Sequence, residues 1–186
     1  MIFTETRLAG AYTIDVEPHE DERGFFARIW DGDEFAAHGL DARVAQASIA
    51  YNRAAGTLRG LHFQAAPHAE TKLVRCTQGA IWDVIVDIRP GSATFLEWIG
   101  VELSAGNRRT LYVPAGFAHG YQTVTEASEV AYQMSTPHVP EAARGLRWDD
   151  QRLAIAWPPA DGRVISDRDR AWPDVDDVLA ALPGRT

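Results

Sequence analysis

Ile81-Trp-Asp-Val-Ile-Val-Asp-Ile88 is the stretch of this chain that decides its fold class. Side chains of a β-strand point alternately to its two faces, so one face of this segment is wholly apolar and carries Trp82, Val84, Val86 and Ile88. The opposite face combines two aliphatic side chains with two carboxylates, namely Ile81, Asp83, Ile85 and Asp87. This period of two predicts a β-strand.

Shorter runs with strand character flank this segment, at 25–30, 44–50, 58–64 and 72–77 before it and at 96–103, 110–113, 118–123 and 129–134 after it. Turns that contain Gly, Pro or Asn separate the later runs, at 78–79, 89–92, 104–107 and 114–116. Many short strands with regular turns predict an all-β fold, an antiparallel sandwich or barrel, and a jelly roll fits the pattern best. We expect one domain over residues 1–186, because no repeat, linker or low-complexity tract divides the chain.

Two short helices are expected within this all-β chain. Asp33 is placed to cap a helix over 34–38, and Gly39 is placed to end that helix. The second helix lies near the C-terminus, over 175–182.

The composition excludes several classes of function. A formal net charge of −8 argues against non-specific nucleic-acid binding. The single cysteine, Cys76, excludes an internal disulfide and fits a reducing compartment. No apolar stretch approaches the length of a membrane span, and no basic N-terminal region precedes a long apolar run. We therefore expect a cytoplasmic protein that binds neither nucleic acid nor membrane.

The segment Gly56-Thr-Leu-Arg-Gly-Leu-His62-Phe-Gln64 places a base beside fixed positive charge. Arg59 lies within it, and Lys72 follows ten residues after His62. This combination suits proton abstraction next to a carbonyl group, since cations stabilise the enolate that forms. A surface strand with an incidental histidine remains the alternative. Strand alternation puts Arg59 and His62 on opposite faces, so if both line one pocket we expect irregular pairing at Gly60.

A second cluster, Tyr112-Val-Pro114-Ala-Gly116-Phe-Ala-His119-Gly-Tyr121, delivers His119 onto a strand through a turn shaped by Pro and Gly. Its Pro-x-Gly-x-x-His pattern resembles the second motif of the cupin superfamily, whose fold is a small jelly roll. Metal-binding cupins use this histidine with a His-x-His pair, but here Gln64 stands two residues after His62. A metal site built from His62, Glu70 and His119 stays open, although a metal-free interpretation is favoured. For His119, a substrate contact is favoured over a structural hydrogen bond.

Two further side chains are candidates for the site. Tyr132, in the predicted strand 129–134, is a core tyrosine unless it faces the pocket of the histidine, where it would be a candidate general acid. Asp169 ends the segment 164–169, which has the composition of a solvated polar loop. Alternatively, Asp169 accepts a hydrogen bond from His62, which would fix the tautomer and stabilise the imidazolium.

Taken in order along the chain, these blocks resemble the dTDP-4-dehydrorhamnose 3,5-epimerase family of nucleotide-sugar enzymes. The resemblance runs through 21–26, 56–64, 72–75, 82–87, 114–120, Tyr132, 145–148, 155–158 and 166–169. It implies a cupin-like jelly roll, a homodimer, and no metal or other cofactor. It also implies epimerisation at C3, C5 or both, beside the C4 ketone of a nucleotide-linked 4-keto-6-deoxy sugar.

The resemblance also implies roles for individual residues. His62 resembles the family's base, and Asp169 resembles the partner of that base. Lys72 resembles the group beside the developing enolate oxygen, and Tyr132 resembles the acid that reprotonates the opposite face. The positions that resemble substrate contacts are Arg23, Gln46, Arg59 and His119, with Phe26 as a candidate for contact with the nucleotide across a dimer interface.

Departures from the family pattern gather at the rim of the expected site. Arg28 stands where a glutamate is usual, and Ala143 replaces a glutamate that contacts substrate. His138 takes the place of the aromatic residue that stacks on thymine, so we expect His138 in the substrate site with weaker stacking. We therefore expect the chemistry to be kept and the selectivity for thymidine to be loosened or shifted.

The function expected from the sequence is epimerisation of such a sugar in deoxysugar or surface-polysaccharide biosynthesis. His62 removes the proton that the C4 ketone acidifies, and Tyr132 or solvent returns a proton on the other face. Two alternatives stay open: a cupin that binds sugar nucleotides without turnover, and a metal-dependent cupin enzyme.

Overall fold

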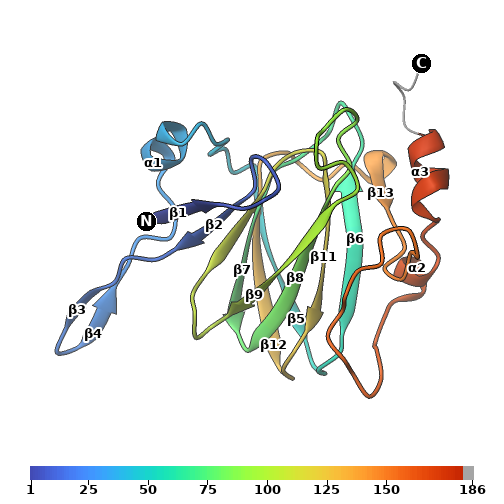
Figure 1. Cartoon of the computed structure of the whole chain (residues 1–186). Helices are drawn as coiled ribbons and strands as arrows, with labels where there is room; N and C mark the ends of the chain where they lie inside the picture. Colours follow the sequence, from blue (N-terminus) through green and yellow to red (C-terminus); the bar gives the residue numbers. More distant parts are fainter. Residues whose placement is uncertain (182–186) are drawn as a thin grey trace.

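Two antiparallel sheets packed face to face form the body of the protein in the computed structural model, which describes residues 1–181 (Figure 1). In order across the first sheet, the strands are β1 (Ile2–Glu5), β2 (Tyr12–Asp15), β10 (Thr110–Val113), β7 (Lys72–Gln78), β12 (Ser128–Met134) and β5 (Gln46–Asn52). Across the second sheet they are β13 (Ala143–Gly145), β6 (Leu58–Gln64), β11 (Phe117–Thr123), β8 (Ala80–Asp87) and β9 (Trp98–Ser104). The antiparallel sandwich expected from the strand pattern is confirmed.

Strand β8 separates the two main hydrophobic cores. Its Ile81 and Ile85 are fully buried between the two sheets. Its Val84 and Val86 point the other way, into a core that the C-terminal part of the chain completes with Leu146, Leu153, Val175, Val178 and Leu179. Each fully buried aliphatic side chain contributes roughly 1.5–3 kcal/mol to folding. The alternation predicted for 81–88 is therefore confirmed.

The predicted strands from β5 to β12 are all present, with boundaries that agree with the prediction to within a few residues, whereas the prediction is poorer for the short strands outside this range. β6 and β10 begin and end at the predicted residues, and β5, β7, β8, β9, β11 and β12 differ from prediction by a few residues. The predicted strand 25–30 is wrong beyond Phe26, where β4 (Gly24–Phe26) ends. The pattern misses β1, β2 and β13, because Ile14 is the only buried residue of the first two and β13 has only three residues.

The first helix begins earlier than the sequence predicts. α1 (Gly32–Ala37) is capped by Asp31, whose carboxylate accepts hydrogen bonds from the backbone N–H groups of Asp33 and Glu34. The predicted cap, Asp33, is therefore wrong, since it lies within the first turn. Gly39, at φ +70°, ends the helix as predicted. No helix within residues 1–181 is long and apolar enough to cross a membrane.

The remaining helical turns lie in the C-terminal part of the chain. α3 (Val175–Ala181) confirms the predicted C-terminal helix, although Leu182 lies outside the described residues. A 3-10 turn, η1 (Pro140–Ala142), precedes β13. The predicted polar loop is instead the short helix α2 (Asp167–Arg170), and it buries Asp169 to 5% exposure.

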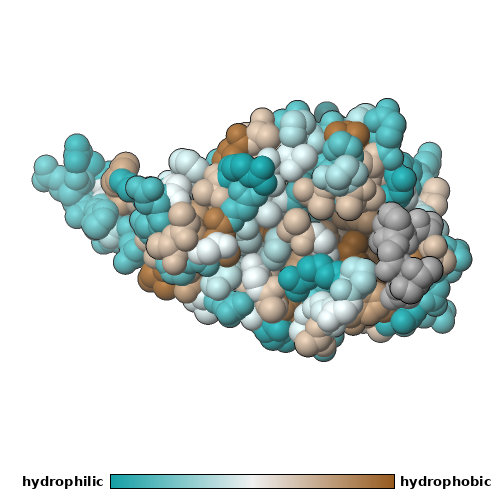
Figure 2. All heavy atoms as spheres, turned by 90° about the horizontal axis from the view of Figure 1, so that it is seen from above, coloured by the Kyte–Doolittle hydropathy of each residue, from teal (hydrophilic) through white to brown (hydrophobic). Residues whose placement is uncertain are grey.

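A hairpin of β3 (His19–Asp21) and β4 projects from the body, and we call residues 19–26 the arm (Figures 1 and 2). Every residue of the arm is exposed. Phe25 lies against the guanidinium of Arg108, which is 4.5 Å from its ring centre, whereas Phe26 is 69% exposed. An apolar side chain held away from the body in this way indicates contact with another surface.

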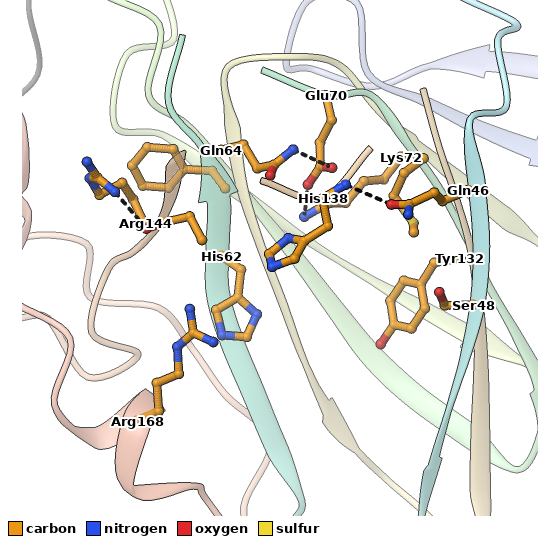
Figure 3. A pocket seen from close by; sticks show the side chains of 13 residues that line it. Gln46, Ser48, His62, Gln64, Glu70, Lys72, Tyr132, His138, Arg144 and Arg168 are labelled. Carbon is orange, nitrogen blue, oxygen red and sulfur yellow. Dashed lines mark hydrogen bonds and ion pairs between the residues drawn. The ribbon is translucent and has the colours of Figure 1, made fainter. Parts of the chain in front are cut away.

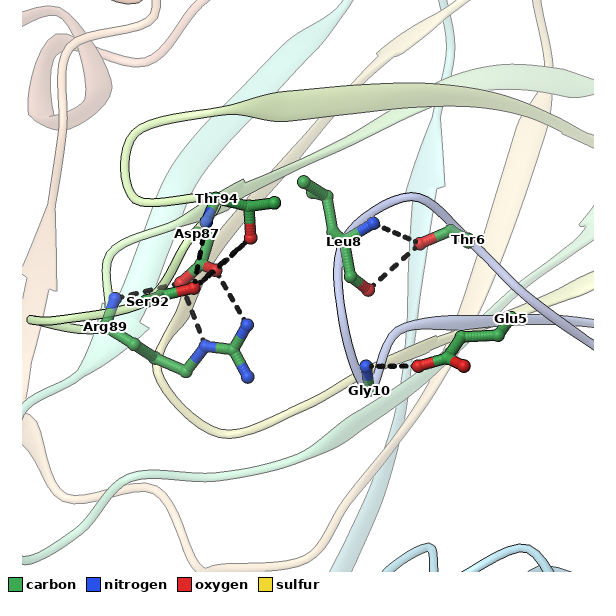
Figure 4. A network of polar contacts seen from close by, with 8 residues as sticks. All are labelled: Glu5, Thr6, Leu8, Gly10, Asp87, Arg89, Ser92 and Thr94. Carbon is green, nitrogen blue, oxygen red and sulfur yellow. Dashed lines mark hydrogen bonds and ion pairs between the residues drawn. The ribbon is translucent and has the colours of Figure 1, made fainter.

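A polar network around Asp87 holds the loop that follows β8 (Figure 4). The fully buried carboxylate accepts hydrogen bonds from the Arg89 guanidinium (2.9 and 2.7 Å), the Ser92 hydroxyl (2.6 Å) and the Thr94 hydroxyl (2.7 Å). Burial alone would raise the pKa of Asp87, but these donors outweigh it and lower the pKa to about 2. Because Arg89 also lies 4.5 Å over the ring of Phe117, the network ties this loop to β11.

Candidate active site

A cavity of about 460 Å³ is lined by strands of both sheets (Figure 3). The side chains that line it include Gln46 and Ser48 from β5, His62 from β6, Lys72 from β7, Tyr132 from β12, His138 and Arg144 from the segment around η1 and β13, and Arg168 from α2. Residues predicted from motifs far apart in the sequence therefore meet in one cavity.

His62 and Asp169 form a hydrogen-bonded pair at the wall of this cavity. The His62 Nε2 lies 2.6 Å from the Asp169 Oδ1, and the Trp172 Nε1–H donates to the same oxygen over 3.2 Å. Burial opposes ionisation of Asp169, but the hydrogen bonds from His62 and Trp172 and the charge of His62 hold its pKa below the usual value. An ionised partner assigns the proton of neutral His62 to Nε2, which leaves Nδ1 free to accept a proton.

A bulge at Gly60 brings Arg59 and His62 to the same side of β6. The register between β6 and β11 shifts between the pair at His62 and the pair at Arg59. The Arg59 Nε–H donates to the Asn52 Oδ1 over 2.9 Å, and Asn52 is buried between the sheets beside Tyr121. Gly60 has φ +121°, and a Cβ there would lie 2.5 Å from the Gly120 Cα. The irregular pairing expected at Gly60 is confirmed.

Tyr132 lies across the cavity from His62, and its hydroxyl is held in the protonated form (Figure 3). Burial is the main cause that raises the pKa of Tyr132 well above its usual value, and Tyr121 and Asp83 add to the effect. The Tyr132 ring meets the edge of the His119 ring, with centroids 6.2 Å apart. A neutral phenol in this position is able to donate a proton into the cavity.

His119 and Asp83 form a second pair, deeper in the sandwich. The His119 Nε2 lies 2.8 Å from the Asp83 Oδ1, and the two residues are 4% and 0% exposed. Burial raises the pKa of Asp83, and its Oδ2 has no hydrogen-bond partner within residues 1–181. His119 pairs with His62 in the register of β11 and β6. No role was predicted for Asp83 from the sequence. Its position between Ile81 and Ile85 on the inward face of β8 nevertheless predicts burial, and a buried carboxylate needs a polar partner.

The three side chains of the alternative metal site, His62, Glu70 and His119, each contact another side chain. His62 contacts Asp169, His119 contacts Asp83, and the Glu70 carboxylate lies 3.1 Å from the Lys72 ammonium. Within residues 1–181, no group of three or more His, Cys, Asp or Glu side chains is placed to hold a metal ion. This geometry gives the metal alternative no support.

Of the predicted substrate contacts, Gln46 and His138 line the cavity. Arg59 and His119 do not line it, and their side chains are bonded to Asn52 and Asp83 instead. The fold also leaves Arg23 and Phe26 away from the cavity of their own chain. Both lie on the arm, which extends away from the sandwich (Figure 1). The Arg23 side chain is 85% exposed and pairs with Asp21, its neighbour in the same hairpin. Conversely, Arg168 lines the cavity and was not predicted, although it directly precedes Asp169 in the sequence.

Comparison with known proteins places this geometry in a family. Residues 5–177 match the family model of dTDP-4-dehydrorhamnose 3,5-epimerase. The chain belongs to this family. It is 41% identical to the dTDP-4-dehydrorhamnose 3,5-epimerase of Escherichia coli strain K12 over 175 residues, which cover 94% of each protein.

Solved structures of related epimerases have the same fold. The Bacillus anthracis dTDP-4-dehydrorhamnose 3,5-epimerase, with TDP and PPi bound, matches with a TM-score of 0.90 and 40% identity over 94% of this chain and 99% of that one. A 3′-monoepimerase from Streptomyces bikiniensis in complex with dTDP-quinovose matches with a TM-score of 0.87 and 32% identity over 95% and 90%. The predictions of family, cupin-like fold and enzyme class, a nucleotide-sugar epimerase, are confirmed.

Proposed function

We propose that this epimerase inverts C3, C5 or both in a dTDP-linked 4-keto-6-deoxy sugar, using its own side chains and no cofactor. The observation that carries the proposal is the placement of His62 and Tyr132 on opposite walls of one cavity (Figure 3). A base and an acid on opposite sides of a carbon invert its configuration, because the proton leaves one face and returns to the other. The thymidine-linked ligands of the related structures support the choice of nucleotide.

The reaction follows from this geometry in two proton transfers. The His62 Nδ1 takes a proton from the carbon beside the ketone, and the electron pair of that C–H bond moves to the carbonyl oxygen as an enolate. The positive charge of Lys72, whose side chain lines the cavity, lowers the energy of this oxyanion. Tyr132 then donates its proton to the opposite face of the carbon, which restores the ketone. Solvent reprotonates the Tyr132 phenolate and receives the proton from His62.

Exchange with solvent deuterium tests the proposal. In deuterated water, the wild-type protein is expected to incorporate deuterium at C3 or C5 of dTDP-4-keto-6-deoxyglucose and to form the inverted sugar. Nucleotide binding without deuterium incorporation would instead establish the non-catalytic alternative. Activity that a chelator removes and an added metal ion restores would establish the metal-dependent alternative.

We also propose that the active protein is a homodimer in which each arm reaches the cavity of its partner. Apolar side chains are exposed on the outer face of the first sheet and on the segment between β4 and α1. Ile49 and Tyr51 of β5 are 68% and 51% exposed, and Ile29 of that segment is 49% exposed. Ile29 and Ile49 border a groove of about 560 Å³ that is also lined by Leu73 and Ala131. A second copy on this face would cover these side chains and give the exposed arm a surface to contact.

Mixing two impaired variants at a substrate concentration far below KM, where weaker binding lowers the rate directly, tests the exchange of arms. If the arm acts in the partner, a mixed dimer of Arg23→Ala and His62→Asn chains has one intact site, built from the His62 of one chain and the Arg23 of the other. Random mixing of equal amounts would therefore restore about a quarter of the wild-type activity, since half of the dimers are mixed and half of their sites are intact. If each arm served its own chain, no intact site would form and activity would stay at the level of the separate variants.

A cytoplasmic location remains a proposal that rests on the single cysteine, which fits a reducing compartment. Cell fractionation with antibody detection is the direct measurement, and recovery outside the cytoplasmic fraction would contradict the proposal.

A further inference from the structure

The Glu70 carboxylate lies between two hydrogen-bond donors at the wall of the cavity (Figure 3). Its Oε1 is 3.1 Å from the Lys72 Nζ, and its Oε2 accepts a hydrogen bond from the Gln64 Nε2 over 3.1 Å. The Glu70 and Lys72 side chains are only 10% and 12% exposed. Water therefore has little access to replace either contact.

Gln64 is itself fixed by the chain around it. Its Nε2 also donates to the backbone carbonyls of His68 and Pro137, and its Oε1 accepts from the Val139 N–H over 2.6 Å. Gln64 is 5% exposed and cannot rotate without breaking these contacts. The amide therefore presents a fixed donor to Glu70, and through it the carboxylate joins Lys72 to the segment that carries His138.

Lys72 is the only lysine in the 186 residues, and all the other residues in the Lys and Arg total are arginines. An ammonium is a compact charge on a flexible stem with three donors, so its position depends on the acceptors around it. Glu70 is the only carboxylate in an ion pair with Lys72 within residues 1–181. Asp83 acts on Lys72 only through its electrostatic field. The other titratable or charged side chains that line the same cavity are His62, Tyr132, His138, Arg144 and Arg168.

We propose that Glu70 is a positioning residue for the enolate-stabilising lysine: it holds the Lys72 ammonium in one place and keeps it charged. The catalytic part of this inference rests on the proposed epimerisation. A carboxylate is required because both of its neighbours are donors, and an amide in its place would accept from one and present its own N–H₂ to the other. A displacement of about 1 Å at a reacting site lowers a rate by up to roughly 100-fold.

The substitution Glu70→Gln tests the proposal because it keeps the size of the side chain and removes the charge and one acceptor. We expect kcat to fall by about 10-fold to 100-fold with a much smaller change in KM, since the lysine acts on the developing oxyanion. Glu141→Gln is the matched control, because Glu141 is an exposed acid on η1 whose side chain does not line the cavity. It is expected to leave both parameters unchanged.

The charge of Lys72 is measured separately, without substrate. Protein labelled with ¹³C at the lysine ε-carbon gives one lysine signal, which belongs to Lys72. Removing the carboxylate from a largely buried ammonium disfavours the charged form. The signal of the uncharged amine is therefore expected at a lower pH in Glu70→Gln than in wild type. Glu70→Asp, which keeps the charge but is shorter, is expected to titrate as wild type does and to recover part of kcat.

Unchanged kcat and an unchanged Lys72 titration in a folded Glu70→Gln protein would overturn the inference. So would equal loss of kcat in Glu70→Gln and Glu70→Asp with identical titrations, which would reduce Glu70 to packing. Failure of the proposed function is recognised differently, because the wild-type protein would then show no exchange with any 4-keto sugar while the Lys72 titration still reports on Glu70.

Discussion

The cavity and the arm differ in how far their ion pairs are buried. In the cavity and just behind it, three basic groups are bonded to largely buried carboxylates of the same chain: His62 to Asp169, Lys72 to Glu70 and His119 to Asp83. On the arm, Arg23 contacts only its neighbour Asp21, and Phe26 is 69% exposed. The groups proposed for proton transfer thus lie together within one chain, whereas Arg23 and Phe26, which are expected at the nucleotide, do not lie near them.

This difference in burial indicates which substitutions are expected to affect the chemical step and which are expected to affect binding. A charge that is buried and paired is held in place, so its loss changes the geometry at the reacting atoms. An exposed charge on a projecting hairpin contributes only when another surface reaches it. We therefore expect cavity variants to lower the rate of exchange and arm variants to weaken the binding of the nucleotide.

The largest expected effect is in the cavity. His62→Asn removes the base and is expected to lower solvent deuterium exchange by about 10²–10⁴-fold, the usual contribution of a positioned general base. Asp169→Asn keeps the shape but removes the negative partner of the imidazolium, so we expect a smaller loss of kcat with little change in KM. Exchange at the wild-type rate in a folded His62→Asn protein would rule out this base.

The arm is expected to show a smaller effect on a different parameter. Arg23→Ala should weaken the binding of thymidine diphosphate by about 10-fold, because a charge-assisted hydrogen bond to phosphate contributes roughly 1.5 kcal/mol or more. Isothermal titration at two salt concentrations measures this, and the difference from wild type should shrink as salt rises. An unchanged dissociation constant for the diphosphate would remove the arm from the nucleotide site.

The same Asp-x-Arg contact occurs on the arm and in the loop that follows β8, which allows a matched comparison of stability. Asp87 pairs with Arg89 and is buried, whereas Asp21 pairs with Arg23 and is exposed. The pKa of Asp87 is lowered to about 2, so its contribution is fully present above the unfolded value near 4 and is lost as pH falls from about 4 to 2. That contribution is about 2 kcal/mol.

Thermal unfolding at a series of pH values checks this comparison. We expect Asp87→Asn to be less stable than wild type at pH 7 and the two proteins to approach each other below pH 3. Asp21→Asn should unfold at the wild-type temperature throughout. A similar loss in both variants would show that the local motif, rather than its burial, sets the energy.

The smallest effect is expected at the nucleotide base. His138 lines the cavity, and its backbone N–H is held by the Gln46 Oε1 over 2.7 Å. Since imidazole offers less stacking area than a larger aromatic ring, we expect thymidine, cytidine and guanosine diphosphates to bind within about 10-fold of one another. His138→Tyr should favour the thymidine diphosphate by a few fold. A strong thymidine preference in the wild type at moderate salt would assign the stacking role to another side chain.

The sequence predicts those parts of the molecule whose determinants are local. The alternation in β8 defines both cores because each residue needs only its neighbours to be assigned a face. Gly60 marks the bulge within β6 that precedes His62, and Gly116 marks the turn that precedes the strand of His119. The fold confirms these assignments, including the bulge that turns Arg59 and His62 to one side.

The parts that the sequence does not predict depend on distant partners. In the sequence, Asp83 is simply a polar residue in a largely apolar strand. Its partner His119 is 36 residues further along the chain, and only the fold brings the two together. The segment 164–169 has a polar composition, yet the contact of Asp169 with His62 spans 107 residues and buries it. The arm looks like the start of a longer strand, because exposure of Phe26 is a property of the whole fold rather than of its neighbours.

The central claim is that a proton leaves on the His62 side and returns from the Tyr132 side. Tyr132→Phe tests it most directly, because this variant removes the acid and leaves the base, Asp169 and Lys72 in place. In deuterated water, with the dTDP-linked 4-keto sugar as substrate, we predict that NMR will show exchange at the reacting carbon near the wild-type rate and a sharp loss of inverted product. Equal loss of exchange and inversion would contradict it, and so would inversion at the wild-type rate.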